Sequence, residues 1–269
     1  MYDVICNYVS EYFGITQDPI TEEIMIIMPY YDGDLIRYIK NNFYGDWYKK
    51  LCKLRDIIVG LIQIHSANIV HRDLHSGNIL LKQVHYSLLY AEIGDLGISK
   101  SATESTDDDN NDNYGIIPYM APEIFHGHKY TAASDIYSFG MIMWELMTGR
   151  RPFWDRNHDT DLIIEICDGL RPPIVTNAPE GYIELMKECW QSDPNKRPTG
   201  NVIFEEVENM YINEQDNVFF KNPTKIIESP DIGPVTINNP GAFYKSRSLS
   251  GMIQSAMSLR SSRNQSIGK

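Results

Sequence analysis

HRDLHSGN, at residues 71–78, is a polar stretch held between two apolar runs, IV at 69–70 and ILL at 79–81. GDLG follows at 94–97 and MAPE at 120–123. Short apolar runs bounded by polar residues are typical of buried strands, and polar stretches carried on such a scaffold are where functional side chains concentrate. The sequence therefore offers two carboxylates and one amide, those of Asp73, Asp95 and Asn78, at the ends of core segments.

The order and spacing of these motifs resemble the protein kinase family. HRDLHSGN, together with DIYSFG at 135–140 and WEL at 144–146, looks most like the tyrosine-kinase-like group of that family. The family carries a catalytic loop of the form H-R-D-L-x-x-x-N, a metal-binding D-F-G and an A-P-E in this order. Phosphoryl transfer explains the set, because one carboxylate orients the attacking hydroxyl while another carboxylate and an amide hold Mg²⁺ against the phosphates. The resemblance implies an α+β, protein-kinase-like fold with a mostly helical large lobe and an incomplete small β lobe.

The resemblance covers residues 8–212. Only 70 residues precede His71, and they contain neither a glycine-rich loop nor a strand lysine of the V-A-I-K type, so we expect the first half of the small lobe to be missing. Residues 1–212 are expected to form a partial kinase domain, with 8–45 the remnant of the small lobe and hinge and 46–212 the large lobe. Residues 213–269 are expected to be a disordered Ser/Asn/Pro-rich tail, because their composition is too polar to bury a core.

The resemblance assigns catalytic roles to Asp73 and His75 and metal-binding roles to Asn78 and Asp95. Asp73 would accept a hydrogen bond from the substrate hydroxyl and later its proton. His75 stands where serine/threonine kinases commonly place a lysine that touches the γ-phosphate, and Ile116 stands where many of them have threonine. An amide and a carboxylate suffice for Mg²⁺ because nucleotide phosphates and water complete its six oxygen ligands. ATP and Mg²⁺ are therefore the expected cofactors.

The hinge and adenine site are expected where an apolar run ends in turn residues. Residues 24–28 (IMIIM) predict a buried strand, and residues 29–34 (PYYDGD) break it. By resemblance, the residues that bind the nucleotide are Met28, Pro29, Tyr30, Tyr31 and Leu80.

Supporting roles are also implied by the resemblance. His71 would pack beneath residues 94–97, Arg72 would grip a phosphorylated residue of the activation loop, and Asp135 would accept backbone hydrogen bonds from the catalytic loop. Glu123 and Arg197 would form a buried ion pair. The activation loop is expected at 99–113, where a polar run includes DDDNND at 107–112.

Helical periodicity supports a mostly helical body. Apolar residues recur at three- and four-residue steps from 47 to 68, and further helices are expected at 135–147, 161–168, 182–190 and 202–211.

The amino-acid composition argues against some classes of binding partner. The formal net charge of −12 argues against a nucleic-acid binder, and no apolar run is long enough to predict a membrane span. The four cysteines are scattered without a C-x-x-C pair, which favours a reducing, cytoplasmic setting. The expected partners are a protein substrate, ATP, and a regulatory partner or a full-length kinase relative.

The sequence leaves two alternatives open. The leading interpretation is an intracellular signalling enzyme that transfers the ATP γ-phosphoryl group to a protein hydroxyl, Ser/Thr rather than Tyr. The alternative is a catalytically weak or inactive kinase-like module, or a fragment of a longer active kinase. The tail is basic after Asp231. It is either a passive extension or a regulatory segment that lies against the acidic body.

Overall fold

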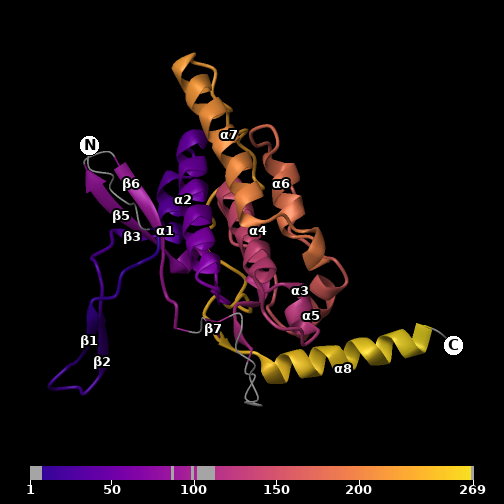
Figure 1. Cartoon of the computed structure of the whole chain (residues 1–269). Helices are drawn as coiled ribbons and strands as arrows, with labels where there is room; N and C mark the ends of the chain where they lie inside the picture. Colours follow the sequence, from indigo (N-terminus) through magenta and orange to yellow (C-terminus); the bar gives the residue numbers. More distant parts are fainter. Residues whose placement is uncertain (1–7, 86–87, 98–99, 102–112, 268–269) are drawn as a thin grey trace.

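The computed structural model describes residues 8–85, 88–97, 100–101 and 113–267. The acidic run expected in the activation loop, 107–112, lies outside these residues. In Figure 1 the described part consists of a helical body, a three-stranded sheet beside α2 and a hairpin that projects from the body. The mixture of helices with short sheets is the α+β, kinase-like architecture expected from the sequence.

Helices lie at the five ranges predicted from periodicity, and further helices lie outside those ranges. The α-helices are α1 (Leu35–Asn42), α2 (Trp47–Ser66), α3 (Pro122–Phe125), α4 (Ala132–Thr148), α5 (Thr160–Cys167), α6 (Tyr182–Cys189), α7 (Gly200–Phe219) and α8 (Ser250–Ile267). Short 3-10 helices are η1 (Ser76–Asn78), η2 (Ile117–Tyr119) and η3 (Pro194–Lys196). Among the described residues, no helix combines the length and apolarity needed to span a membrane.

The strands are short and form separate small sheets. They are β1 (Gly14–Gln17), β2 (Ile24–Ile27), β3 (Gly33–Asp34), β4 (Ile69–Val70), β5 (Ile79–His85), β6 (Leu88–Ile93), β7 (Lys100–Ser101), β8 (Tyr114–Gly115) and β9 (Arg247–Ser248). The pairs are antiparallel: β1 with β2, β3 with β5 and β5 with β6, β4 with β7, and β8 with β9. The catalytic-loop motif therefore lies between β4 and β5, with η1 at its end.

Helix α4 forms the centre of the helical body. Every residue from Ser134 to Thr148 is buried, as expected for a helix that is apolar on all sides. It begins with a capping box between Thr131 and Ser134. It ends at Gly149, whose φ of +74° suits glycine and where an added Cβ would lie 2.6 Å from Cδ2 of Phe43.

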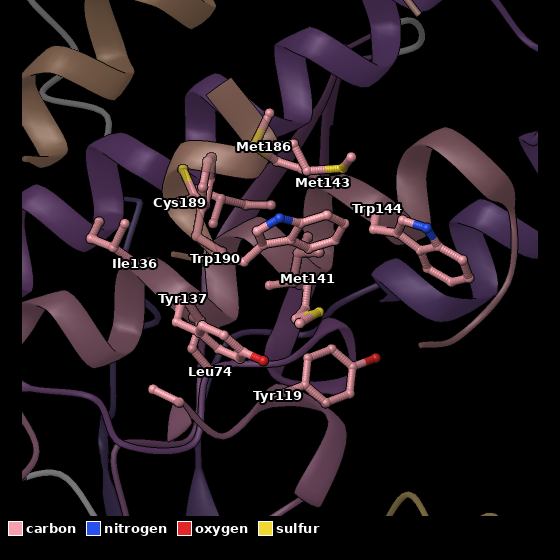
Figure 2. Close-up of a cluster of buried hydrophobic side chains, with 14 of the residues drawn as sticks. Leu74, Tyr119, Ile136, Tyr137, Met141, Met143, Trp144, Met186, Cys189 and Trp190 are labelled. Atoms are coloured by element: carbon pink, nitrogen blue, oxygen red, sulfur yellow. The ribbon is translucent and has the colours of Figure 1, made fainter. Parts of the chain in front are cut away.

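Figure 2 shows the aromatic and sulfur-containing side chains that fill this core. The labelled residues are Leu74, Tyr119, Ile136, Tyr137, Met141, Met143, Trp144, Met186, Cys189 and Trp190. Leu74, next to Asp73 in the catalytic loop, is 1% exposed. Burying such a side chain contributes about 1.5–3 kcal/mol, so the loop is anchored to the core at this residue.

The hairpin of β1 and β2 differs from the sequence expectation. Asp18 shapes its turn, since the Asp18 carboxylate accepts hydrogen bonds from the backbone N–H groups of Ile20 and Thr21. The apolar run 24–28 was expected to be a buried strand, but β2 is exposed along its whole length. The reason is that β1 is its only described strand partner and no other described element covers the hairpin (Figure 1).

The C-terminal tail also differs from expectation. Residues 213–269 were expected to be disordered, yet α7 continues to Phe219, β9 pairs with β8, and α8 extends to Ile267. The segment between α7 and β9 is hydrogen-bonded to the helical body. For example, the Gly233 N–H donates to the Thr148 carbonyl at 2.7 Å. Polar composition was a poor guide here, because isolated apolar residues at helical spacing bury one face of α8, as described below.

A buried lysine on α2 gives a testable pH dependence. Lys50 is 3% exposed, its Nζ donates to the Leu146 carbonyl at 3.0 Å, and burial lowers the pKa of Lys50 from 10.5 to about 7. The folded state binds the proton of the Lys50 ammonium less tightly than the unfolded chain does. The free-energy cost of burying this charge is therefore fully present below pH 7, and it falls as the pH rises toward 10.5.

We therefore expect Lys50→Met to flatten the rise of unfolding free energy between pH 7 and 9.5 by about 1–3 kcal/mol. Contact of Nζ with the Phe43 and Trp47 rings, at 4.2 and 4.9 Å from their centroids, keeps the effect below the full desolvation cost. Urea titrations at several pH values measure it. The control is Lys49→Met, since the Lys49 side chain is 56% exposed. Identical pH curves for Lys50→Met and the wild type would contradict the account.

Candidate active site

The catalytic loop is fixed by a carboxylate in the first turn of α4. Asp135, which is 1% exposed, accepts backbone N–H bonds from His71 at 2.9 Å and Arg72 at 3.0 Å. Oδ2 of Asp135, the oxygen that accepts the His71 bond, also lies 2.8 Å from Nε2 of His65. These bonds compensate the burial of the Asp135 charge. They hold Arg72 at a φ of +74°, an uncommon conformation that neighbouring structure must enforce.

His71 links the catalytic loop to residues 94–97. Its ring is fully buried, with Nε2 3.0 Å from the Gly94 carbonyl and Nδ1 3.3 Å from the backbone N–H of Asp73. Because a carbonyl only accepts and an N–H only donates, these partners assign the proton to Nε2 of a neutral imidazole. His71 thus lies beneath the GDLG motif, where the resemblance placed it.

Asp73 and Asn78 are joined directly. The Asn78 side-chain N–H₂ donates to the Asp73 carbonyl at 3.0 Å, and the Asn78 carbonyl accepts the Gly94 N–H at 2.8 Å. Since the Asn78 amide nitrogen is used by the loop, the amide orientation leaves its side-chain oxygen as the group for a metal or phosphate-bound water. The same bonds bring the loop and the GDLG motif together.

Asp95 adopts a left-handed conformation at the start of the next loop. Its φ is +56°, its N–H donates to the Tyr12 hydroxyl at 2.8 Å, and its carboxylate accepts the Gly97 N–H at 3.2 Å. Asp tolerates this conformation better than most residues. The carboxylate is consequently presented at an exposed position beside the loop.

Asn78 and Asp95 share a cavity of about 700 Å³. The other lining residues are Tyr12, Phe13, Gly14, Ile15, Ile26, Met28, Leu80, Gly94, Leu96 and Gly97. A mostly apolar cavity lined with a few polar groups is the usual form of a small-molecule site. Its size and polarity fit a nucleotide, with the base against the apolar wall and the phosphates beside the amide and carboxylate.

The donor set also fits Mg²⁺ held jointly by protein and phosphate. Asn78 and Asp95 supply hard oxygen donors, as Mg²⁺ requires. Among the described residues no cluster of three or more His, Cys, Asp or Glu side chains is suited to a metal ion. A metal at this site would therefore need phosphate oxygens and water to complete its coordination.

The structure brings together only some of the residues predicted to bind the nucleotide. Met28 and Leu80 line the cavity, whereas Pro29, Tyr30 and Tyr31 are not among its lining residues. Tyr30 is 89% exposed. The Tyr31 hydroxyl lies 2.8 Å from Ser10 Oγ and donates to Glu92 Oε2 at 2.6 Å, and burial raises the pKa of Tyr31 above its usual value.

His75 lies against Asp73. Its Nδ1 accepts the Gly77 N–H at 3.0 Å, and its Nε2 is 3.7 Å from Oδ2 of Asp73. Because Nδ1 is an acceptor, the proton of a neutral ring is on Nε2 and faces the Asp73 carboxylate. Neither residue is among those lining the cavity, so any contact of His75 with a phosphate requires the nucleotide to extend toward Asp73.

The ion pair expected between Glu123 and Arg197 is present and buried. Two parallel bonds of 2.7 Å join the guanidinium to the carboxylate. Arg197 also donates to the carbonyls of Gln191 and Ala133 at 2.8 Å, and Ser134 Oγ donates to Glu123 at 3.2 Å. This network ties Glu123, the last residue of MAPE, to the end of η3 and the start of α4.

Several cavity residues were missed by the sequence interpretation. Tyr12, Phe13, Ile15 and Ile26 are among its lining residues, and none of them was predicted to bind the nucleotide. The available signal was Gly14, because a glycine in a strand can mark a site that a ligand or another backbone approaches closely.

The comparisons with known proteins agree with this geometry. A family profile described as protein tyrosine and serine/threonine kinase matches residues 1–207. The chain therefore belongs to the protein kinase family, in agreement with a tyrosine-kinase-like type.

Relatives from distant organisms show the same similarity. The chain is 32% identical over 250 residues (86% of the chain) to "Probable serine/threonine-protein kinase roco6" of Dictyostelium discoideum. It is 36% identical over 193 residues (68%) to "Probable serine/threonine-protein kinase roco8" of the same organism, and 32% identical over 196 residues (71%) to Ephrin type-A receptor 5 of Rattus norvegicus. The matches cover 11%, 10% and 18% of these relatives, so the chain spans a small part of their length.

Proposed function

We propose that this chain transfers the γ-phosphoryl group of ATP to a hydroxyl of a protein substrate. The observation that carries the proposal is that Asn78 and Asp95 both line one mainly apolar cavity, while Asn78 is bonded to the backbone of Asp73. Catalysis of phosphoryl transfer is almost entirely positioning and electrostatic stabilisation, and this constellation supplies both.

Each residue has a distinct role in the proposal. Asp73 orients the substrate hydroxyl and accepts its proton late in the reaction. Asn78 and Asp95 hold Mg²⁺, which neutralises charge developing on the phosphates. Met28 and Leu80 contact the base on the apolar wall. Asp135 and His71 keep the loop in place rather than react.

Serine or threonine is the proposed acceptor. The support is that relatives such as roco6 and roco8 are named serine/threonine-protein kinases, although a receptor named for ephrin is also among the relatives. Ile116 is 3% exposed and has no hydroxyl to offer Asp73. The residue at this position therefore does not decide between serine or threonine and tyrosine as the acceptor.

A second function has one specific observation in its favour. Among the described residues that line the cavity there is no lysine or arginine. The nearby Lys82 is instead 3.7 Å from Glu92. A kinase-like module that binds nucleotide weakly and acts through a regulatory partner or a full-length relative is therefore the alternative.

Nucleotide titration separates the two functions. We expect ATP binding to the wild type to be weak but tightened by Mg²⁺, because Asp95 is a metal ligand in the proposal. Asp95→Asn should reduce that Mg²⁺ enhancement by about tenfold, which corresponds to about 1.4 kcal/mol. Calorimetry with and without Mg²⁺ measures the difference. Asp46→Asn, at the exposed start of α2, is the matched control.

If Mg²⁺ leaves ATP affinity unchanged in the wild type, the metal site is wrong and the non-catalytic module is favoured.

We also propose a cytoplasmic location, supported by the free thiols of Cys52, Cys167 and Cys189. The division into a kinase domain at 1–212 and a C-terminal segment remains part of the proposal.

A further inference from the structure

The C-terminal segment crosses the molecule beside the proposed catalytic aspartate. Strand β9 pairs with β8, so that Arg247 lies opposite Gly115 and Ser248 opposite Tyr114. Gly115 is close to the reacting group, since a Cβ added to it would lie 3.9 Å from Oδ1 of Asp73. An extended polypeptide therefore already lies where a protein substrate has to approach Asp73.

Backbone hydrogen bonds extend this pairing beyond the two strands. The Leu249 N–H donates to the Asn113 carbonyl at 2.7 Å, and the Asn113 N–H donates to Ser250 Oγ at 3.0 Å. Arg247 also donates to the His158 carbonyl at 3.2 Å. The edge of β8 consequently presents the backbone groups that an added strand uses for recognition, and residues 247–250 occupy them.

Helix α8 fastens the strand to the large lobe through an apolar face. Leu249, Ile253 and Ala256 are spaced at i, i+4 and i+7 and are 1%, 6% and 0% exposed. This spacing places them on one side of a helix, and α8 packs against α5. In Figure 1, α8 runs beneath α5 along the edge of the body.

Two ion pairs complete the attachment. Arg260 is 2.8 Å from Asp168, and Arg263 is 2.9 Å from Asp161. Their side chains are partly exposed, from 28% to 62%, so these pairs contribute little to stability and weaken with salt. The apolar residues therefore dominate the attachment, and replacing one of them should release the segment.

We propose that residues 247–263 are an intramolecular ligand of the β8 edge and compete there with the protein substrate. The inference deepens the proposed function, because it assumes that Asp73 acts on a polypeptide bound at that edge. The occupant of this edge is the chain's own tail, through the pairing of β9 with β8. This pairing also identifies the substrate class as an extended segment that pairs with β8 and has an apolar residue in the place of Leu249.

The test compares two neighbouring substitutions in the full chain. Ile253→Asp puts a charge into the buried face of α8, whereas Gln254→Asp puts the same charge at an exposed position of the same helix. The first readout is hydrogen exchange of the backbone amides of Asn113 and Leu249. Exchange should be at least tenfold faster in Ile253→Asp than in the wild type and unchanged in Gln254→Asp. Equal exchange in both variants would overturn the docking.

The second readout is binding of a fluorescent peptide with the sequence of residues 243–263. A docked tail reduces the apparent affinity for an added peptide by the fraction of molecules whose edge is open. Fluorescence anisotropy should therefore give at least tenfold tighter binding to Ile253→Asp than to the wild type or Gln254→Asp. The same affinity for all three proteins would show that the tail does not occupy a polypeptide-binding edge.

The third readout, phosphate transfer to a serine-containing peptide, separates this inference from the proposed function. Ile253→Asp should lower the KM for the peptide at least several-fold while Gln254→Asp does not. If exchange and peptide binding change but no variant transfers phosphate, the proposed function fails and the docking surface stands. If transfer occurs with the same KM in every variant, the competition is overturned and the proposed function stands.

Discussion

Arg197→Ala is expected to lower the free energy of unfolding by about 3–5 kcal/mol, because it leaves the buried Glu123 carboxylate without its partner. Glu123 is 6% exposed and Arg197 7%, so water cannot replace the lost bonds. Glu123→Ala should cost a similar amount, since it strands the guanidinium. Urea denaturation of the wild type, both single variants and the double variant measures the coupling.

The double variant should cost much less than the sum of the two single variants, because it leaves neither charge unpaired. Arg197→Ala also removes the bonds to the Gln191 and Ala133 carbonyls, so it should cost at least as much as Glu123→Ala. Arg156→Ala, at the exposed pair with Glu165, is the control and should cost at most about 1 kcal/mol. Additive costs for Glu123 and Arg197 would rule out the coupling.

Asp73→Asn is expected to reduce single-turnover phosphate transfer by about 10²–10⁴-fold, the usual contribution of a positioned acid–base group. The change is isosteric and keeps the backbone carbonyl that binds Asn78, so the fold and nucleotide affinity should be retained. Rapid mixing of enzyme in excess over labelled ATP, with a serine-containing peptide, measures the chemical step.

The matched control for this prediction is again Asp46→Asn, which removes a carboxylate far from the loop in sequence. Transfer by the wild type is itself expected to be slow, because no described cation lines the cavity. An Asp73→Asn protein that transfers phosphate as fast as the wild type would exclude Asp73 as the base.

Much of the helical body was predictable because its signals are local. The three- and four-residue periodicity of residues 47–68 marks α2, and the apolar stretch from Asp135 marks α4. The motif order also predicted long-range contacts correctly, since Asp135 meets the backbone of the catalytic loop and Glu123 meets Arg197. Each of these contacts joins residues whose chemical types are complementary.

What the sequence did not reveal depends on contacts between distant segments. The run 24–28 has the composition of a buried strand, but exposure of β2 is set by which elements lie beside it. Leu249 and Ile253 are isolated in a polar segment, and only the packing of α8 on α5 shows that they are buried. The Tyr12 hydroxyl reaches the Asp95 backbone across 83 residues, a contact that no local pattern predicts.

Asn78 and Asp95 are proposed to hold a metal-bound nucleotide beside Asp73. Mn²⁺ can replace Mg²⁺ among oxygen ligands, and its paramagnetism broadens the NMR signals of nearby nuclei. Adding Mn²⁺ with ATP to ¹⁵N-labelled protein should broaden the Asn78 side-chain amide and the backbone amides of Asp73 and Asp95 together, and excess Mg²⁺ should restore them. Broadening confined to surface carboxylates such as Asp161 and Asp168, with these three residues unaffected, would contradict the account.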